Sequence, residues 1–211
     1  MLNLSKWVAV LLIFVCTTAV SAETGKQRLL RFFAEVKSLQ ADFTQQMQSK
    51  DFAEIEKSTG TLQMQRPGRF RWDYKIPFEQ QLIADGKNLW IYDVELEQVM
   101  VQPLEKVLGN TPAGLLSGDA KVSDRFIIRD IDPMDEAREL TWIELTPKDA
   151  EASFQVLLMA FGKDLDQLLL TDSFGQKTKI VLSNLVRNPV IDPAVFNFIP
   201  PPGVDVLGES E

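Results

Sequence analysis

The sequence contains no histidine and only one cysteine, Cys16, among its 211 residues. Without histidine there is no imidazole to act as a general base or to bind a metal ion, so Ser-His-Asp and Cys-His catalysis are excluded. The chain also lacks a glycine-rich phosphate-binding loop and a nucleophile elbow. We therefore expect no enzymatic activity, no metal and no other cofactor.

The first 22 residues have the features of a cleavable secretory signal. Lys6 supplies the positive start, and the apolar run Trp7–Val15 is too short to span a bilayer comfortably. Val20-Ser21-Ala22 has the small-x-small pattern of a cleavage site. The sequence therefore predicts an exported protein whose mature chain begins near Glu23 and forms one domain over residues 23–211.

Cys16 is a poor candidate for lipid attachment, because a bacterial lipoprotein signal requires a small residue before the cysteine and Val15 stands there. Loss of the signal would also remove Lys6, its one charged residue, and would change the formal charge from −8 to −9. A chain this acidic is not suited to coat nucleic acid or to bind an anionic bilayer by electrostatics. We expect a soluble exported protein that does not bind nucleic acid.

An amphipathic helix is predicted directly after the signal. Thr24 and Gln27 form the pattern of a capping box, and the helix is expected to run to about Leu39. Its apolar face consists of Leu29, Leu30, Phe32, Phe33 and Val36. This face could simply pack on a core, which is the commoner use of such a stripe.

Beyond the helix the apolar residues recur with period two, which is typical of β-strands. No link between the early strands is long enough for a crossover helix, so the sheet is expected to be largely antiparallel. A short apolar helix is predicted near Asn110–Gly118, with a helical turn at Leu104–Leu108. The predicted strands are residues 43–48, 58–65, 69–75, 80–84, 88–94, 98–102, 125–131, 139–146, 153–161, 165–172 and 177–187.

Ten or eleven strands with few helices predict a mainly β fold, a single strongly curved antiparallel sheet or barrel. Such a barrel encloses more volume than its own side chains fill easily. Two strands, Asn88–Val94 and Ser153–Phe161, are apolar on both faces, which suggests that other elements cover the sheet.

Three groups of residues could carry a function. The acids Asp130, Asp132, Asp135 and Glu136 could suggest a hydrolase or a calcium site, but a solvated turn fits them better. The aromatic residues could form a stacking platform, although aromatics on strands more often pack in a core. These are Phe70, Trp72, Trp90, Tyr92 and Trp142.

Arg66 is the third candidate, because it falls on the same strand face as Leu62 and Met64. An unpaired guanidinium at the end of an apolar row would be unfavourable. Arg66 could extend into solvent beside the Pro67-Gly68 turn, or it could bind a specific partner in the fold. The pattern alone leaves both interpretations open.

Six segments, taken in order, make the chain similar to the LolA family of periplasmic outer-membrane lipoprotein carriers, from Glu23 to Val206. The segments are Leu39–Gln45, Gly60–Leu62, Arg66-Pro67 with Phe70–Trp72, Asp85–Tyr92, Asn110–Pro112 and Phe196–Gly203. The resemblance implies an unclosed antiparallel barrel, covered by the N-terminal helix and short lid helices. An apolar cavity inside it would shelter the acyl chains of lipoproteins.

The resemblance also implies partners and a role for Arg66. A monomeric carrier would take lipoproteins from an ATP-driven (ABC) release complex in the inner membrane and deliver them to a lipoprotein receptor at the outer membrane. The family's Arg-Pro arginine, here Arg66, bonds to the lid backbone and keeps the empty cavity shut. The membrane-anchored receptor of the same fold is the nearest alternative; a lipid-binding or adaptor module, a hydrolase and an outer-membrane barrel are others.

On this basis we expect two sets of residues around the cavity. The lid residues are Leu29, Phe32, Phe33, Val36, Ala113, Leu115 and Leu116. The expected cavity wall is Phe70, Trp72, Leu89, Ile91, Phe154, Val156 and Leu158, with the inward face of the later strands chosen without a decisive pattern.

Overall fold

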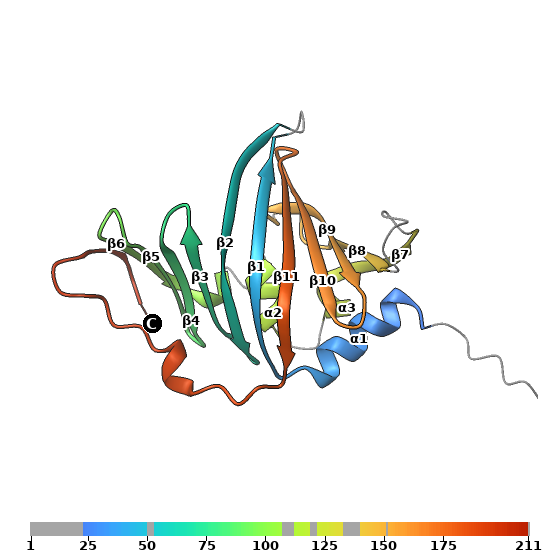
Figure 1. Ribbon diagram of the computed structural model, residues 1–211, viewed down its shortest axis with the longest axis horizontal. Coiled ribbons are helices and arrows are strands. Elements are labelled where there is room, and N and C mark those ends of the chain that lie inside the picture. Colours follow the sequence, from blue (N-terminus) through green and yellow to red (C-terminus); the bar gives the residue numbers. More distant parts are fainter. Residues whose placement is uncertain are drawn as a thin grey trace, which may run out of the picture.

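The computed structural model describes residues 23–49, 53–106, 112–118, 122–132, 140–150 and 152–210. The predicted signal peptide, residues 1–22, lies outside these ranges. Most of the described chain forms one strongly curved, twelve-stranded sheet, in the order β12-β6-β5-β4-β3-β2-β1-β11-β10-β9-β8-β7 (Figure 1). The predicted mainly β fold, one curved sheet covered by few helices, is confirmed.

Each predicted period-two segment contains a strand, although β1 begins five residues and β2 four residues before the predicted start. They are β1 (Ser38–Gln48), β2 (Glu54–Gln65), β3 (Arg69–Ile76), β4 (Gln80–Asp85), β5 (Asn88–Asp93), β6 (Gln98–Pro103), β7 (Phe126–Ile131), β8 (Thr141–Pro147), β9 (Phe154–Phe161), β10 (Leu165–Asp172), β11 (Lys177–Arg187) and β12 (Asp205–Gly208). Neighbouring strands are antiparallel except β12, which pairs in parallel with β6. β12 was not predicted, and it takes the strand number above the expected ten or eleven.

The N-terminal helix, α1 (Gly25–Glu35), begins as predicted but is shorter than predicted. Thr24 caps it, with the reciprocal bonds to Gln27 of a capping box. The expected end near Leu39 is wrong, because Val36 already has extended backbone and Leu39 pairs with Met64 in the sheet. Pairing of β1 with β2 thus outweighs the helical periodicity of the sequence.

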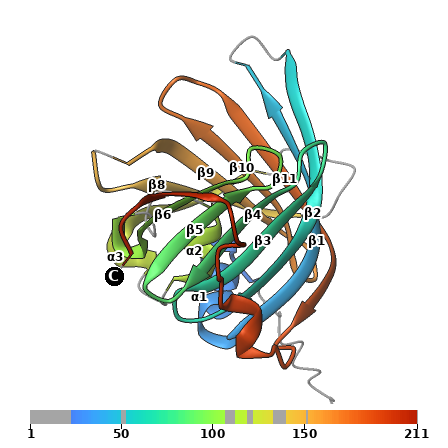
Figure 2. The ribbon, with the colours of Figure 1, turned by 90° about the vertical axis from the view of Figure 1, so that its left-hand side faces the viewer.

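Four short helical elements complete the fold: η1 (Leu104–Lys106), α2 (Pro112–Ser117), α3 (Val122–Arg125) and η2 (Pro193–Phe196). Both helical segments predicted between residues 104 and 118 are present in shorter form, whereas α3 was not predicted. Figure 2 shows α2 inside the curve of the sheet, with α1 at one end of the molecule. No helix in the described ranges is long and apolar enough to cross a membrane.

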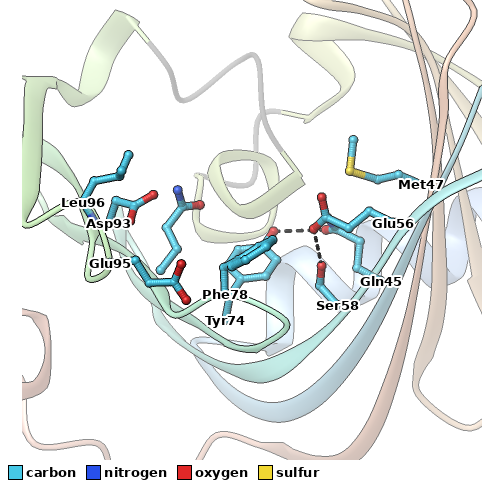
Figure 3. A pocket seen from close by; sticks show the side chains of 10 residues that line it. Gln45, Met47, Glu56, Ser58, Tyr74, Phe78, Asp93, Glu95 and Leu96 are labelled. Atoms are coloured by element: carbon cyan, nitrogen blue, oxygen red, sulfur yellow. Dashed lines mark hydrogen bonds between the residues drawn. The ribbon is translucent and has the colours of Figure 1, made fainter.

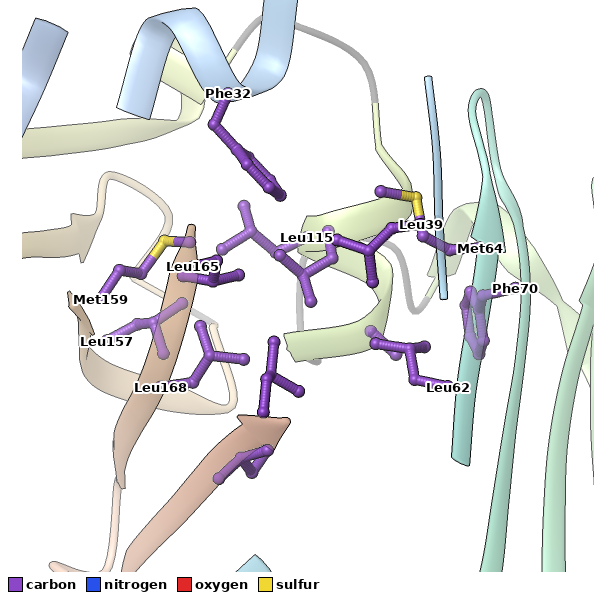
Figure 4. Packing of buried hydrophobic residues seen from close by; sticks show 14 of the residues in the cluster. Phe32, Leu39, Leu62, Met64, Phe70, Leu115, Leu157, Met159, Leu165 and Leu168 are labelled. Carbon is purple, nitrogen blue, oxygen red and sulfur yellow. The ribbon is translucent and has the colours of Figure 1, made fainter. Parts of the chain in front are cut away.

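The hydrophobic core lies between the concave face of the sheet and the helices. Leu115 of α2 lies between side chains of β9 and β10 on one side and of β1 to β3 on the other (Figure 4). These side chains form rows across the sheet, because paired residues of neighbouring strands point to the same face. One such row is Leu62, Trp72, Leu82 and Ile91 of β2 to β5.

Candidate functional site

Arg66 lies at the turn between β2 and β3, and this turn is hydrogen-bonded to the carboxyl ends of α1 and α2. The Arg66 backbone N–H donates to the carbonyl of Lys37, just beyond α1, over 2.8 Å. The Gly68 N–H donates to the carbonyl of Ser117, the last residue of α2, also over 2.8 Å. The turn therefore places the Arg66 side chain between the carboxyl ends of α1 and α2.

The guanidinium of Arg66 donates hydrogen bonds to the backbone at both helix ends. Nε bonds the carbonyl of Leu116 in α2 at 2.9 Å. Nη1 lies 3.3 Å from the carbonyl oxygen of Phe32, 3.0 Å from that of Phe33 and 2.5 Å from that of Val36. The last carbonyls of a helix lack partners within the helix and carry partial negative charge, so a cation there is favourable. Arg66 thus joins both helices to the sheet.

The same guanidinium lies over two aromatic rings of α1, 4.4 Å from the ring centre of Phe33 and 5.2 Å from that of Phe32. Burial lowers the pKa of Arg66 to about 10, so the group remains charged near neutral pH. Nη2 is buried and has no hydrogen-bond partner among the described residues. Arg66 does not extend freely into solvent.

The residues expected to form the lid are all buried. Their exposed fractions range from 0% to 6%, and they belong to the same cluster as the inner face of the sheet. Phe32 also packs edge-on against Phe161 of β9, with ring centres 5.8 Å apart. The structure brings together Leu29, Phe32, Phe33 and Val36 with Ala113, Leu115 and Leu116.

Four of the seven residues expected in the cavity wall lie on the inner face of β3 and β5. Phe70, Trp72 and Leu89 are buried in the main core, and Ile91 packs against it partly buried. Phe154 of β9 belongs to the same core. Whether acyl chains contact these side chains stays a prediction.

The expectation that Val156 and Leu158 line the cavity is wrong. Leu158 packs against the separate cluster of Leu140, Trp142 and Ala160, while Leu157 and Met159 face the main core. The cause is a register shift against β10, where Thr171 pairs with Val156 but Asp172 pairs with Phe154. The extra residue between them lets Phe154 and Leu157 share one face, which simple alternation does not allow. The inner face of β9 is therefore Leu157, Met159 and Phe161.

An apolar pocket of about 190 Å³ opens beside α2 within the curve of the sheet. It is smaller than the roughly 300–1,000 Å³ of ordinary small-ligand sites, because Leu115 and Leu116 fill the concave space. A larger ligand would need α2 to move. The pocket is lined by Gln45, Trp72, Tyr74, Leu82, Ala113, Leu170, Thr178 and Ile180.

Comparison with known proteins decides how this arrangement is classified. Residues 34–199 match the family described as "Outer membrane lipoprotein carrier protein LolA". The chain belongs to the LolA family. It is 38% identical over 201 residues to the outer-membrane lipoprotein carrier protein of Nitrosomonas europaea, covering 94% of this chain and 96% of that protein. It is 41% identical over 194 residues to the protein of the same name from Methylococcus capsulatus, covering 91% and 92%.

A solved structure supports the same fold at low sequence identity. The uncharacterized conserved protein of Thermus thermophilus aligns with a TM-score of 0.53 and 13% identity, covering 86% of this chain and 98% of that one. The LolA family assignment itself rests on the sequence matches.

A second pocket in this LolA-family chain was missed by the sequence analysis. It measures about 460 Å³ and shares Gln45 and Tyr74 with the apolar pocket (Figure 3). Tyr74 has the same strand parity as Phe70 and Trp72, which could have pointed to it, but Gln45 stands in a polar segment without a clear pattern. The second pocket is lined by Gln45, Met47, Glu56, Ser58, Tyr74, Phe78, Gln80, Asp93, Glu95 and Leu96.

The remaining sequence candidates that the structure describes do not gather into a further site. Asp130 accepts a hydrogen bond at 2.9 Å from the Lys26 N–H in the first turn of α1, while Asp135 and Glu136 lie outside the described residues. No group of three or more acidic, histidine or cysteine side chains in the described ranges could hold a metal ion.

Trp90 and Tyr92 do not form an open stacking platform either. Both pack against Phe198 of the C-terminal segment, with ring centres 5.7 and 5.8 Å away. The Trp90 indole donates to Asp85 at 2.9 Å. Burial favours a higher pKa for Asp85, but hydrogen bonds from the Asn88 and Lys87 backbone and from Trp90 outweigh it, and its pKa is lowered.

Proposed function

We propose that this protein is a periplasmic carrier that shelters the acyl chains of lipoproteins beneath α1 and α2. The observation that carries the proposal is Arg66, which fixes both helix ends over an apolar concave face. A core that only stabilises the fold does not need breakable polar contacts between the covering helices and the sheet. Family relatives named as outer-membrane lipoprotein carrier proteins support the same function.

The physical need for such a carrier follows from acyl-chain hydration. Each CH₂ group exposed to water loses about 0.8 kcal/mol of favourable transfer energy, so two or three long chains are disfavoured by tens of kcal/mol. A lipoprotein therefore crosses an aqueous compartment only with its chains covered. The buried lid residues, including Leu115 and Leu116, provide apolar surface that could cover them after α2 moves.

The Arg66 contacts oppose loading. Charge-assisted hydrogen bonds contribute roughly 1.5 to 3 kcal/mol each to the closed, empty state. If cargo displaces α2, the bond from Arg66 to Leu116 breaks and net affinity falls by a similar amount. Arg66 would thereby set the balance between holding cargo and releasing it.

The proposal includes partners and processing. The chain would be exported with cleavage after Ala22, would act as a monomer without catalysis, and would carry out its transfer as one domain over residues 23–211. It would receive lipoproteins from the inner-membrane ABC release complex and deliver them to the outer-membrane receptor. The receptor of similar fold is a less favoured alternative, because it requires a lipidated cysteine and Val15 precedes Cys16.

Native mass spectrometry of the protein isolated from the periplasm tests the proposal. We expect a chain that begins at Glu23, and a fraction of it in one-to-one complexes with intact lipoproteins, increased when the outer-membrane receptor is depleted. A lipid-modified cysteine on the protein itself would favour the receptor alternative. Absence of bound lipoprotein under receptor depletion would contradict the carrier function.

A further inference from the structure

The inner face of the sheet changes from apolar to polar along the strands of β2 to β5. A second row lies next to the apolar row of Leu62, Trp72, Leu82 and Ile91, two residues away on each strand and on the same face. This second row is Gly60, Tyr74, Gln80 and Asp93. The 190 Å³ apolar pocket lies at the first row, and the 460 Å³ pocket, which we call the polar vestibule, extends from the second.

Gln45 and Tyr74 mark the boundary, because both residues line both pockets. The Tyr74 hydroxyl donates to Gln45 Oε1 at 3.1 Å (Figure 3). Gln45 is only 9% exposed, yet its amide nitrogen donates to no group in the part of the chain that the structure describes. This nitrogen is not among the fully buried polar atoms that lack a partner, and Gln45 lines both pockets, so the amide is accessible to donate to a carbonyl oxygen of a ligand.

The vestibule is acidic. Its ten lining residues include Glu56, Asp93 and Glu95, and none of the ten is lysine or arginine. Ser58, which is buried, donates to Glu56 at 2.7 Å and holds this carboxylate beside the Gln45–Tyr74 pair (Figure 3). A cleft lined by one sign of charge attracts ligands of the opposite sign.

We propose that the polar vestibule binds the head of the cargo's lipid anchor and the peptide that follows it, and that it selects cationic peptide over acidic peptide. The acyl chains enter the apolar pocket once α2 has moved, and the Gln45 amide donates to an ester or amide carbonyl where the chains join the head. Glu56, Asp93 and Glu95 face the following residues. This proposal rests on the carrier function proposed above, and it adds the chemistry of the preferred cargo.

Two synthetic lipopeptides test the selection. They share one triacylated cysteine head and differ only in four lysines or four glutamates after it. Each lipopeptide is titrated by calorimetry into the protein purified after export from cells. At low salt the lysine lipopeptide should bind about tenfold more tightly than the glutamate lipopeptide. The difference should shrink at high salt, because partly exposed charges are screened.

The vestibule variant Glu56→Gln/Asp93→Asn/Glu95→Gln should bring the two affinities within about twofold of each other. A matched control, Glu35→Gln/Asp205→Asn/Glu209→Gln, changes the net charge equally at three exposed positions and should keep the difference. Gln45→Leu should weaken both lipopeptides severalfold without changing their ratio. Circular dichroism checks that each variant is folded.

The failures are distinguishable. Tight, equal binding of both lipopeptides by the unaltered protein would overturn the selection and leave the carrier function standing. Binding of neither would overturn both proposals. If the vestibule variant keeps the lysine preference but no longer transfers cargo to receptor-bearing liposomes, the acids serve a protein partner and the present assignment is wrong.

Discussion

At Arg66, a single side chain joins three parts of the fold that are far apart in sequence. Its carbonyl partners lie 30 to 50 residues away, at the ends of α1 and α2. The apolar parity of Leu62 and Met64 identified Arg66 as unusual from the sequence. The partners themselves could not be found in this way, because backbone carbonyls carry no sequence signature and their positions depend on where both helices end.

Replacement of Arg66 by leucine should shift the balance toward cargo. Arg66→Leu removes the charge-assisted bonds of the closed state and adds apolar surface, so we predict lipoprotein binding at least as tight as that of the unaltered protein. Release should be slower by tenfold or more, as expected from the loss of about 1.5 kcal/mol or more from the empty state. Transfer from the variant to receptor-bearing liposomes measures this rate.

Arg69 provides the control for Arg66. It lies three residues further along the same hairpin, and its side chain is exposed. Arg69→Leu should bind and release lipoprotein like the unaltered protein. Delivery by Arg66→Leu at the unaltered rate would contradict the proposed role of the guanidinium.

The burial of Tyr74 should be detectable as a raised pKa of its hydroxyl group. Burial, the largest effect, raises the pKa of Tyr74 from 10.0 to about 12, the Gln45 hydrogen bond lowers it and the charge of Glu56 raises it. The folded protein thus holds the phenolic proton more tightly than the unfolded chain does. The resulting stability is fully present below about pH 10 and is lost as the pH rises through about 12.

Tyr92→Phe leaves Tyr74 as the only tyrosine, because the chain has two. Ultraviolet titration of this variant should show tyrosinate forming near pH 12 when folded and near pH 10 in denaturant. The free energy of unfolding should fall between these pH values less steeply in Tyr74→Phe than in Tyr92→Phe. A folded-state midpoint near pH 10 would show that Tyr74 is not buried in solution.

Among the elements, α1 and β9 show where periodicity predicts well and where it fails. The capping box located the start of α1, because its hydrogen bonds are local in sequence. Its end depends on strand pairing of Leu39, which is not local. In β9 one inserted residue reverses the inward face after Phe154, and both faces are apolar, so the sequence offered no way to choose.

The cap of α1 should support the closed lid. Thr24→Ala removes the hydrogen bond to the Gln27 N–H and should destabilise the helix by about 1 kcal/mol. Amides of α1 should then exchange with solvent about fivefold faster, as measured by hydrogen–deuterium exchange. Asp192→Ala removes the equivalent cap of η2 and should leave α1 unchanged; unaltered exchange in Thr24→Ala would contradict the stabilising role of the cap.

At the scale of the whole molecule, the mainly β fold was predictable because its strands are long and regularly alternating. β12 was not, since its four residues are all exposed and show no buried alternate positions. The C-terminal segment that leads to it is anchored instead by Phe196 of η2, which is 1% exposed and lies near β3 and β4, outside the main core cluster. Together with the contacts of Phe198 with Trp90 and Tyr92, we expect Phe196 to stabilise the segment more than β12 does.

Removal of residues 204–211 should therefore affect stability less than a single substitution. The deletion removes β12, whose Val206 and Leu207 are about half exposed, and should lower the free energy of unfolding by about 1 kcal/mol. Phe196→Ala should lower it by about 3 to 5 kcal/mol. Urea unfolding compares the two; a deletion as damaging as Phe196→Ala would show that β12 pairing dominates.

The strand order ends at β7 on one side and β12 on the other, and these two strands do not pair with each other. In a closed barrel the circumference is set by strand number and stagger, and widening it requires ladder hydrogen bonds to break. A sheet with a seam is free of this constraint, because its two margins can move apart while every interior strand keeps both neighbours. The space inside the curved sheet can thus widen or narrow with the size of the bound ligand, because the sheet only has to bend.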